Sequence, residues 1–106
     1  MSQYSKSQPV IHDQLTQAEN KSIDIDTSPS TITFSQEIHA LEIVNASETS
    51  ILYIDFSGIA STSTGLPIYP RQYYSCSRKM ISFSIVSNAA STDARIMGHF
   101  DYEALN

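Results

Sequence analysis

Apolar and polar side chains alternate along two stretches of the chain, Ile51–Ser57 and Met80–Val86. The apolar positions are Leu52, Ile54 and Phe56 in the first stretch and Ile81, Phe83 and Ile85 in the second. A period of two is typical of strands that bury one face. We therefore predict that these two stretches form the centre of a β core.

Shorter segments with the same period lie on both sides of this pair. They cover residues 22–26, 31–34, 72–77 and 94–102, and polar or turn-forming residues separate them. About seven or eight short strands with almost no helical pattern are typical of an all-β fold. The pattern favours an antiparallel β-sandwich or a jelly-roll-like barrel.

Three segments fit this pattern less well. Glu37–Val44 carries apolar residues on both faces, which indicates either a bulge near Ala40–Leu41 or a strand covered on both sides. The two prolines of Leu66–Pro70 cannot donate to a central ladder, so this segment is expected at a sheet edge or in a crossing between sheets. The polar segment Gly58–Gly65 is expected to be an exposed loop.

The first 20 residues are rich in Ser and Gln and show no sustained period. We expect residues 1–20 to be an extended or flexible N-terminal arm. Residues 21–106 are expected to form a single β-sandwich domain, because a chain of 106 residues suits one compact domain. The isolated apolar residues Val10, Ile11 and Leu15 are candidates for contacts between the arm and a neighbouring subunit.

Charge and composition exclude several classes of partner. Six basic residues stand against eleven acidic ones, so nucleic acid is not expected, because phosphate binding depends on clustered cations. The start of the chain lacks the apolar stretch of a signal peptide, and no run reaches the roughly 20 apolar residues of a membrane span. We expect synthesis in a cytoplasm and no membrane partner. The single cysteine, Cys76, allows no internal disulfide.

Polar side chains near the C-terminus offer a candidate for metal chemistry. His99, Asp101 and Glu103 share one face of the last predicted strand, and their nitrogen and oxygen atoms suit a divalent ion. The same spacing arises whenever a half-buried strand turns polar residues to solvent. We favour that second explanation and expect no metal, no cofactor and no enzymatic activity. A small metal-dependent enzyme built on these residues is the least favoured hypothesis.

Catalytic motifs of other kinds carry little information in this sequence. A Ser-His-Asp set can be drawn from His39 or His99 because serines are abundant, but no nucleophile elbow is present. With three glycines in the chain, a glycine-rich phosphate loop is also missing.

Three tyrosines and an arginine gather in a short segment and suggest an interaction surface. Tyr69, Arg71, Tyr73 and Tyr74 are the interface candidates of the folded part. Tyrosine combines a large apolar ring with a polar tip, which suits either a protein interface or stacking on a sugar. Packing of some of these rings beneath a loop is equally compatible with the pattern.

A pattern of apolar and turn residues across residues 38–102 resembles a known family. It consists of Leu41-x-Ile43-x-Asn45-x-Ser47, Ile51–Phe56, Gly65-x-Pro67-Ile68-x-Pro70, Ile81-x-Phe83-x-Ile85-x-Ser87 and Arg95-Ile96-x-Gly98. This pattern resembles small β-sandwich virion proteins of tailed bacteriophages, the head-decoration and tail-associated modules. Such proteins often have Gly after the second proline, where this chain has Arg71, so a different turn is expected there.

The resemblance implies a non-enzymatic virion structural protein, a capsid-decoration or cement-type subunit or another auxiliary subunit. Assembly through the arm and the sheet edges is expected. The implied partners are copies of the chain itself, for example as a trimer, and other virion proteins such as the major capsid protein. The implied location is the virion, after synthesis in the host cytoplasm. The alternative is a tail- or fibre-associated module that binds carbohydrate or a receptor, such as host surface glycans.

Overall fold

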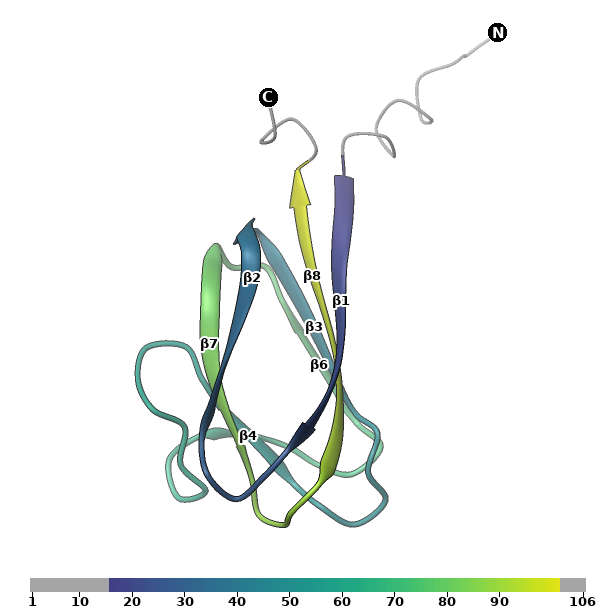
Figure 1. Cartoon of the computed structure of the whole chain (residues 1–106), viewed down its shortest axis with the longest axis vertical. Helices are drawn as coiled ribbons and strands as arrows, with labels where there is room; N and C mark the ends of the chain where they lie inside the picture. Colours follow the sequence, from purple (N-terminus) through teal and green to yellow (C-terminus); the bar gives the residue numbers. More distant parts are fainter. Residues whose placement is uncertain (1–15, 102–106) are drawn as a thin grey trace, which may run out of the picture.

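The computed structural model describes residues 16–101, and all regular secondary structure in that range is β-strand (Figure 1). The strands are β1 (Thr16–Ile25), β2 (Ser30–Ile38), β3 (Ala40–Asn45), β4 (Leu52–Asp55), β5 (Leu66–Ile68), β6 (Tyr73–Cys76), β7 (Met80–Ser87) and β8 (Thr92–Asp101). The structure thus confirms an all-β fold.

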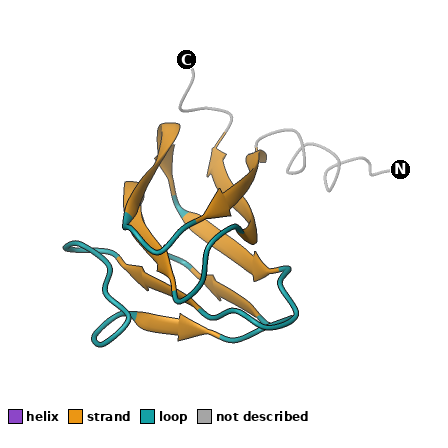
Figure 2. Ribbon diagram, turned by 60° about the horizontal axis from the view of Figure 1, so that its bottom comes forward, coloured by secondary structure: helices purple, strands orange, loops and turns teal. Residues whose placement is uncertain are grey.

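The strands form two four-stranded antiparallel sheets, with the orders β1-β8-β3-β6 and β2-β7-β4-β5 (Figure 2). The first strand pairs with the last, the second with the seventh, the third with the sixth and the fourth with the fifth. This pairing is that of a long hairpin folded over on itself, which is the jelly-roll arrangement of eight strands. The predicted antiparallel sandwich with a jelly-roll-like order is therefore confirmed.

Strands β4 and β7 lie at the centre of their sheet, as the alternating pattern predicts. Their register places Tyr53 opposite Val86 and Ile54 opposite Ile85. The start of β7 differs from the prediction, because Ile81 is 52% exposed while its neighbour Met80 packs against the core. The cause is a register shift in the β2–β7 pairing, after which Met80 is aligned with Ile38.

The ambiguous segment Glu37–Val44 is not one strand but the junction of two. β2 ends at Ile38 in one sheet, and β3 begins at Ala40 in the other. Ile38 and Leu41 are both buried, because each faces the core from its own sheet. The apolar residues on both faces therefore arise from a crossing at His39, and neither expected explanation, a bulge at Ala40–Leu41 or a doubly covered strand, is correct.

The segment Gly58–Gly65, expected to be an exposed loop, folds back onto the sheet β2-β7-β4-β5. Ala60 is buried, and its backbone N–H donates to the Ser84 hydroxyl on the outer face of β7 at 2.8 Å. Ser84 and Val86 are buried on that outer face as well. Ile59, which is the one large apolar residue of this segment, points to solvent and is 77% exposed. One outer face of the sandwich is thus partly covered by its own loop.

Strand β1 begins at Thr16, inside the segment expected to be an arm. It pairs with β8 over its whole length. The inward positions of its first half carry charged side chains, since Glu19 lies opposite Gly98 and Lys21 lies opposite Ile96, while Ile23 and Ile25 of its second half face the core. The Lys21 ammonium sits 5.9 Å from the centroid of the Phe34 ring. The boundary expected at residue 20 therefore falls within a strand.

The Glu19 carboxylate joins the two sheets at the edge where β1 meets β2. Its Oε1 accepts from the backbone N–H and the hydroxyl of Ser35, at 2.9 and 2.8 Å. Ser35 lies within the register shift of β2. The Ser35 amide, supported by the Ser35 hydroxyl and by Lys21, lowers the pKa of Glu19 from its usual value of 4.5, against the opposing effect of burial.

Glu19→Gln tests this contact through pH. Because the folded-state pKa is lowered, the carboxylate contributes stability that is fully present above its unfolded pKa and is lost as the pH falls through the folded value. Urea unfolding at about pH 7 should show the wild type more stable than the variant, and the difference should vanish towards about pH 2. A difference that stays constant across this range would contradict the charged contact.

Candidate interaction surface

A tight turn carries the tyrosine segment from one sheet to the other. The backbone N–H of Gln72 donates to the carbonyl oxygen of Tyr69 at 3.0 Å, with Pro70 and Arg71 between them. Arg71 has a φ of 66°, in the left-handed region that favours glycine. Proline at the second position and a positive φ at the third are the marks of a type II turn. Glycine is thus the favoured residue at the position where the sequence has Arg71.

The side chain of Asn45, at the end of β3, fixes this turn to the rest of the molecule. Asn45 is fully buried, and its Nδ2 donates to the carbonyl oxygens of Ser50 and Ile68 at 2.8 and 2.9 Å. The backbone carbonyl oxygen of Asn45 accepts from the Arg71 N–H at 2.9 Å. One residue therefore connects β3, the loop before β4, the end of β5 and the turn before β6.

The three tyrosines of the segment do not share one surface. Tyr73 is 72% exposed and lies opposite Val44 on the outer face of β3 and β6. Tyr74 points the other way and packs against the core, with its ring centroid 6.2 Å from that of Phe56. Burial raises the pKa of Tyr74. Tyr69 and Tyr73 remain exposed, whereas the arm candidates Val10, Ile11 and Leu15 lie outside the described residues.

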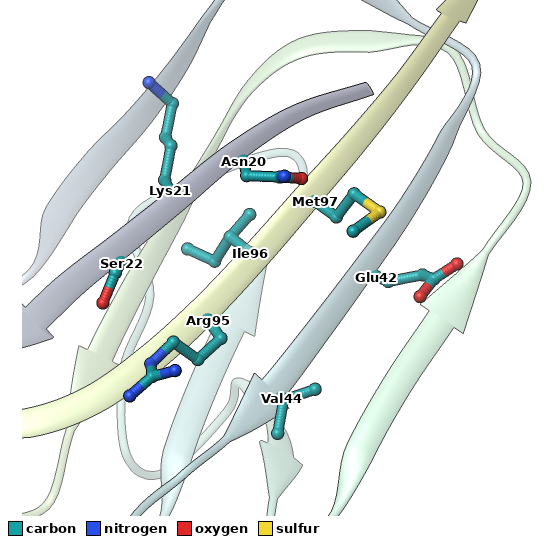
Figure 3. A pocket seen from close by; sticks show the side chains of 8 residues that line it. All are labelled: Asn20, Lys21, Ser22, Glu42, Val44, Arg95, Ile96 and Met97. Carbon is teal, nitrogen blue, oxygen red and sulfur yellow. The ribbon is translucent and has the colours of Figure 1, made fainter. Parts of the chain in front are cut away.

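The outer face of the sheet β1-β8-β3-β6 bears a shallow groove of about 330 Å³ (Figure 3). It is lined by Asn20, Lys21, Ser22, Glu42, Val44, Arg95, Ile96 and Met97. Val44 lies beside Arg95, and Glu42 lies beside Met97, across the β3–β8 pairing. Among residues 17–101, no outward-facing side chain of this sheet is buried, in contrast to the loop-covered face opposite.

The charged side chains at this groove are held by neighbours on the same face. The Arg95 guanidinium donates to both carboxylate oxygens of Asp93, at 3.0 and 2.9 Å. This contact lowers the pKa of Asp93 and raises that of Arg95. Glu42 Oε2 lies 3.2 Å from His99 Nε2. Arg95 and Glu42 are thus both oriented by neighbours on their own sheet face.

The candidate metal ligands separate in the structure. His99 is directed at Glu42, while Asp101 Oδ1 lies 3.2 Å from His39 Nε2. The His39 nitrogen is shielded from solvent and has no partner in hydrogen-bonding geometry, so its approach to Asp101 is not a hydrogen bond. Glu103 lies outside the described residues. In the part of the chain that the structure describes, no three His, Cys, Asp or Glu side chains gather as metal ligands.

A second hollow, of about 260 Å³, lies on the loop-covered side of the sandwich. Its polar lining includes the hydroxyls of Ser82 and Ser84 and the carboxylate of Asp55. Asp55 Oδ1 accepts the backbone N–H groups of Ser57 and Gly58 at 2.8 and 2.9 Å, and these bonds lower the pKa of Asp55. A fixed carboxylate among hydroxyls can accept hydrogen bonds from a polar ligand.

The fold and these surfaces define an eight-stranded jelly-roll domain with one uncovered sheet face. No protein-family model and no curated protein matches the chain. Within residues 16–101, no helix is long and apolar enough to cross a membrane.

Substitution of Arg71 tests the strained turn. Arg71→Gly should be more stable than Arg71→Ala by about 1 kcal/mol, because glycine adopts a positive φ without a steric cost. Both variants lose the exposed ion pair with Glu48, so its small contribution cancels in the comparison. Urea unfolding of the two proteins measures the difference. Equal stability would show that the turn imposes no strain at this position.

Proposed function

We propose that this protein is a non-enzymatic structural subunit of a virion, of the capsid-decoration or similar auxiliary type, that assembles with copies of itself. The observation that carries the proposal is the outer face of the β1-β8-β3-β6 sheet, which the described residues leave uncovered. Val44 and Tyr73 are exposed side by side on that face, at 40% and 72%. Exposed aromatic and aliphatic side chains with a charged surround are typical of protein interfaces.

The fold supports the same proposal by analogy. Jelly rolls of two four-stranded sheets are used by viral capsid domains, and also by lectins and cupins. A fold of this kind hosts several functions, so the analogy adds to the surface argument without replacing it. The resemblance of residues 38–102 to small virion proteins of tailed phages points in the same direction.

Two of the four edge strands, β5 and β1, are poorly suited to assembly. Strand β5 has three residues and includes Pro67, which cannot donate to an added strand. Strand β1 turns the charges of Glu19 and Lys21 inward at its edge, which opposes pairing with another chain. These features weigh against assembly through β1 and β5.

Labelling of virions tests the structural role. Antibodies raised against the full chain should bind the surface of intact, purified particles of the phage that encodes it, in many copies per particle. Preimmune serum on the same particles is the control. Particles that contain none of the chain, by labelling and by mass spectrometry, would contradict the proposal.

A carbohydrate-binding module is the alternative, and the polar hollow at Asp55 is the observation in its favour. A carboxylate charged at neutral pH and neighbouring hydroxyls suit the hydroxyl groups of a sugar. This alternative predicts glycan binding by the isolated chain on an array, and loss of that binding in Asp55→Asn. Binding that survives the substitution would remove the hollow as the site.

A further inference from the structure

We propose that the uncovered face of the β1-β8-β3-β6 sheet binds the same face of a second copy of this chain. The inference rests on the proposed function, because it names the surface through which the structural subunits would meet. Its argument comes from the arrangement of four side chains around the groove in Figure 3.

Four outward-facing side chains form the corners of a rectangle on strands β3 and β8, about 4.8 Å wide between the strands and about 6.8 Å long along them. Arg95 and Val44 are neighbours across the strands, and so are Met97 and Glu42. One diagonal of the rectangle is therefore apolar, from Val44 to Met97. The other diagonal joins opposite charges, from Arg95 to Glu42. Figure 3 shows this arrangement, with Asn20 and Ser22 of β1 beside it.

This pattern is self-complementary about a two-fold axis. An axis along the apolar diagonal superposes Val44 on Val44 and Met97 on Met97 of the second copy. The same rotation brings Arg95 to within about 3 Å of the position that faces Glu42 of the second copy, and Glu42 equally near Arg95, an offset that the two long side chains span. A two-fold interface repeats each contact, so the charge pair forms twice. The strands of the two sheets then cross at about 70°, which is nearer to the orthogonal than to the aligned way of packing sheets face to face.

Arg95 and Glu42 are positioned for this contact, and each keeps polar groups that its neighbours do not bind. Arg95 uses its Nε and Nη2 groups for Asp93, and its side chain is 59% exposed. Glu42 uses Oε2 for His99, and its side chain is 52% exposed. A guanidinium has five N–H donors and a carboxylate has two oxygens, so both groups can bind another partner. Their existing contacts reduce the side-chain entropy that binding must otherwise remove.

The size of the face sets the strength of the association. The four strands lie about 4.8 Å apart, and β1, β8, β3 and β6 have 10, 10, 6 and 4 residues, so the face measures roughly 500 Å². That area is below the roughly 800 Å² per partner of a standard interface. We therefore expect a weak dimer that forms at high local concentration, as on the surface of a particle, and not a permanent one.

Charge exchange between the two copies tests the interface. The full chain is studied by sedimentation equilibrium from about 10 µM to 1 mM, where weak dimers dissociate. Arg95→Glu faces Glu42 of the second copy, and Glu42→Arg faces Arg95, so each single change creates two repulsive contacts. Each should weaken dimerisation at least about ten-fold. The double variant Arg95→Glu/Glu42→Arg restores opposite charges across the axis and should recover most of the affinity.

Matched controls separate this contact from the effect of net charge. Lys79→Glu and Glu37→Arg make the same changes of charge at exposed positions away from the groove. Both should dimerise like the wild type. Urea unfolding of every variant checks that the fold is intact.

The outcomes distinguish this inference from the proposed function. A dimerisation affinity that neither single change alters, or one that is no higher in the double variant than in the single variants, would overturn the interface. A wild-type chain that is monomeric at every concentration would overturn it as well. If Val44→Asp then abolished binding to virions, the face would belong to another virion protein. In each case the labelling of virions reports separately on the structural role.

Discussion

The buried amide of Asn45 fixes the end of the sandwich where the chain crosses between the two sheets. Its nitrogen donates to two backbone carbonyls, and its oxygen accepts the N–H of Ser47. Only an amide side chain offers two donors and an acceptor together. An aliphatic residue in its place would leave the buried carbonyls of Ser50 and Ile68 unpaired, at about 1–3 kcal/mol each, together with the part-buried N–H of Ser47. The strand ends that carry Val44 and Tyr73 are therefore held by a buried polar junction as well as by apolar packing.

The two outer faces of the molecule differ in how far they are covered, although both sheets have four strands. The segment Gly58–Gly65 covers one face, anchored where the Ala60 N–H meets the Ser84 hydroxyl. The other face has no such cover within the described residues, and it carries an apolar diagonal crossed by a diagonal of opposite charges. The two faces therefore differ in what they offer to another molecule. In the proposed two-fold dimer, each copy turns its loop-covered face away from the contact.

The period of two is sufficient to predict the fold class and the central pair, because a half-buried strand must alternate whatever its partners are. The same period separates Tyr73 from Tyr74, so the sequence already contained the signal that their rings diverge. The alternating pattern does not predict the first half of β1, because Glu19 and Lys21 occupy inward positions that are apolar elsewhere. The sequence around His39 contains no glycine or proline, so the pattern predicts one continuous strand across the crossing. The groove depends on the register of β3 against β8, which residues fifty positions apart do not reveal.

The described chain enters and leaves the domain at the same end, since Thr16 is the register neighbour of Asp101 (Figure 1). In mechanical terms, tension on these two ends acts across the β1–β8 pairing and not along it. The hydrogen bonds between the strands are then loaded one after another, each worth only about 1 kcal/mol net, as in the opening of a zipper. A force spread over the sheet face is instead borne by the whole core. The domain therefore resists compression and shear far better than a pull on its ends.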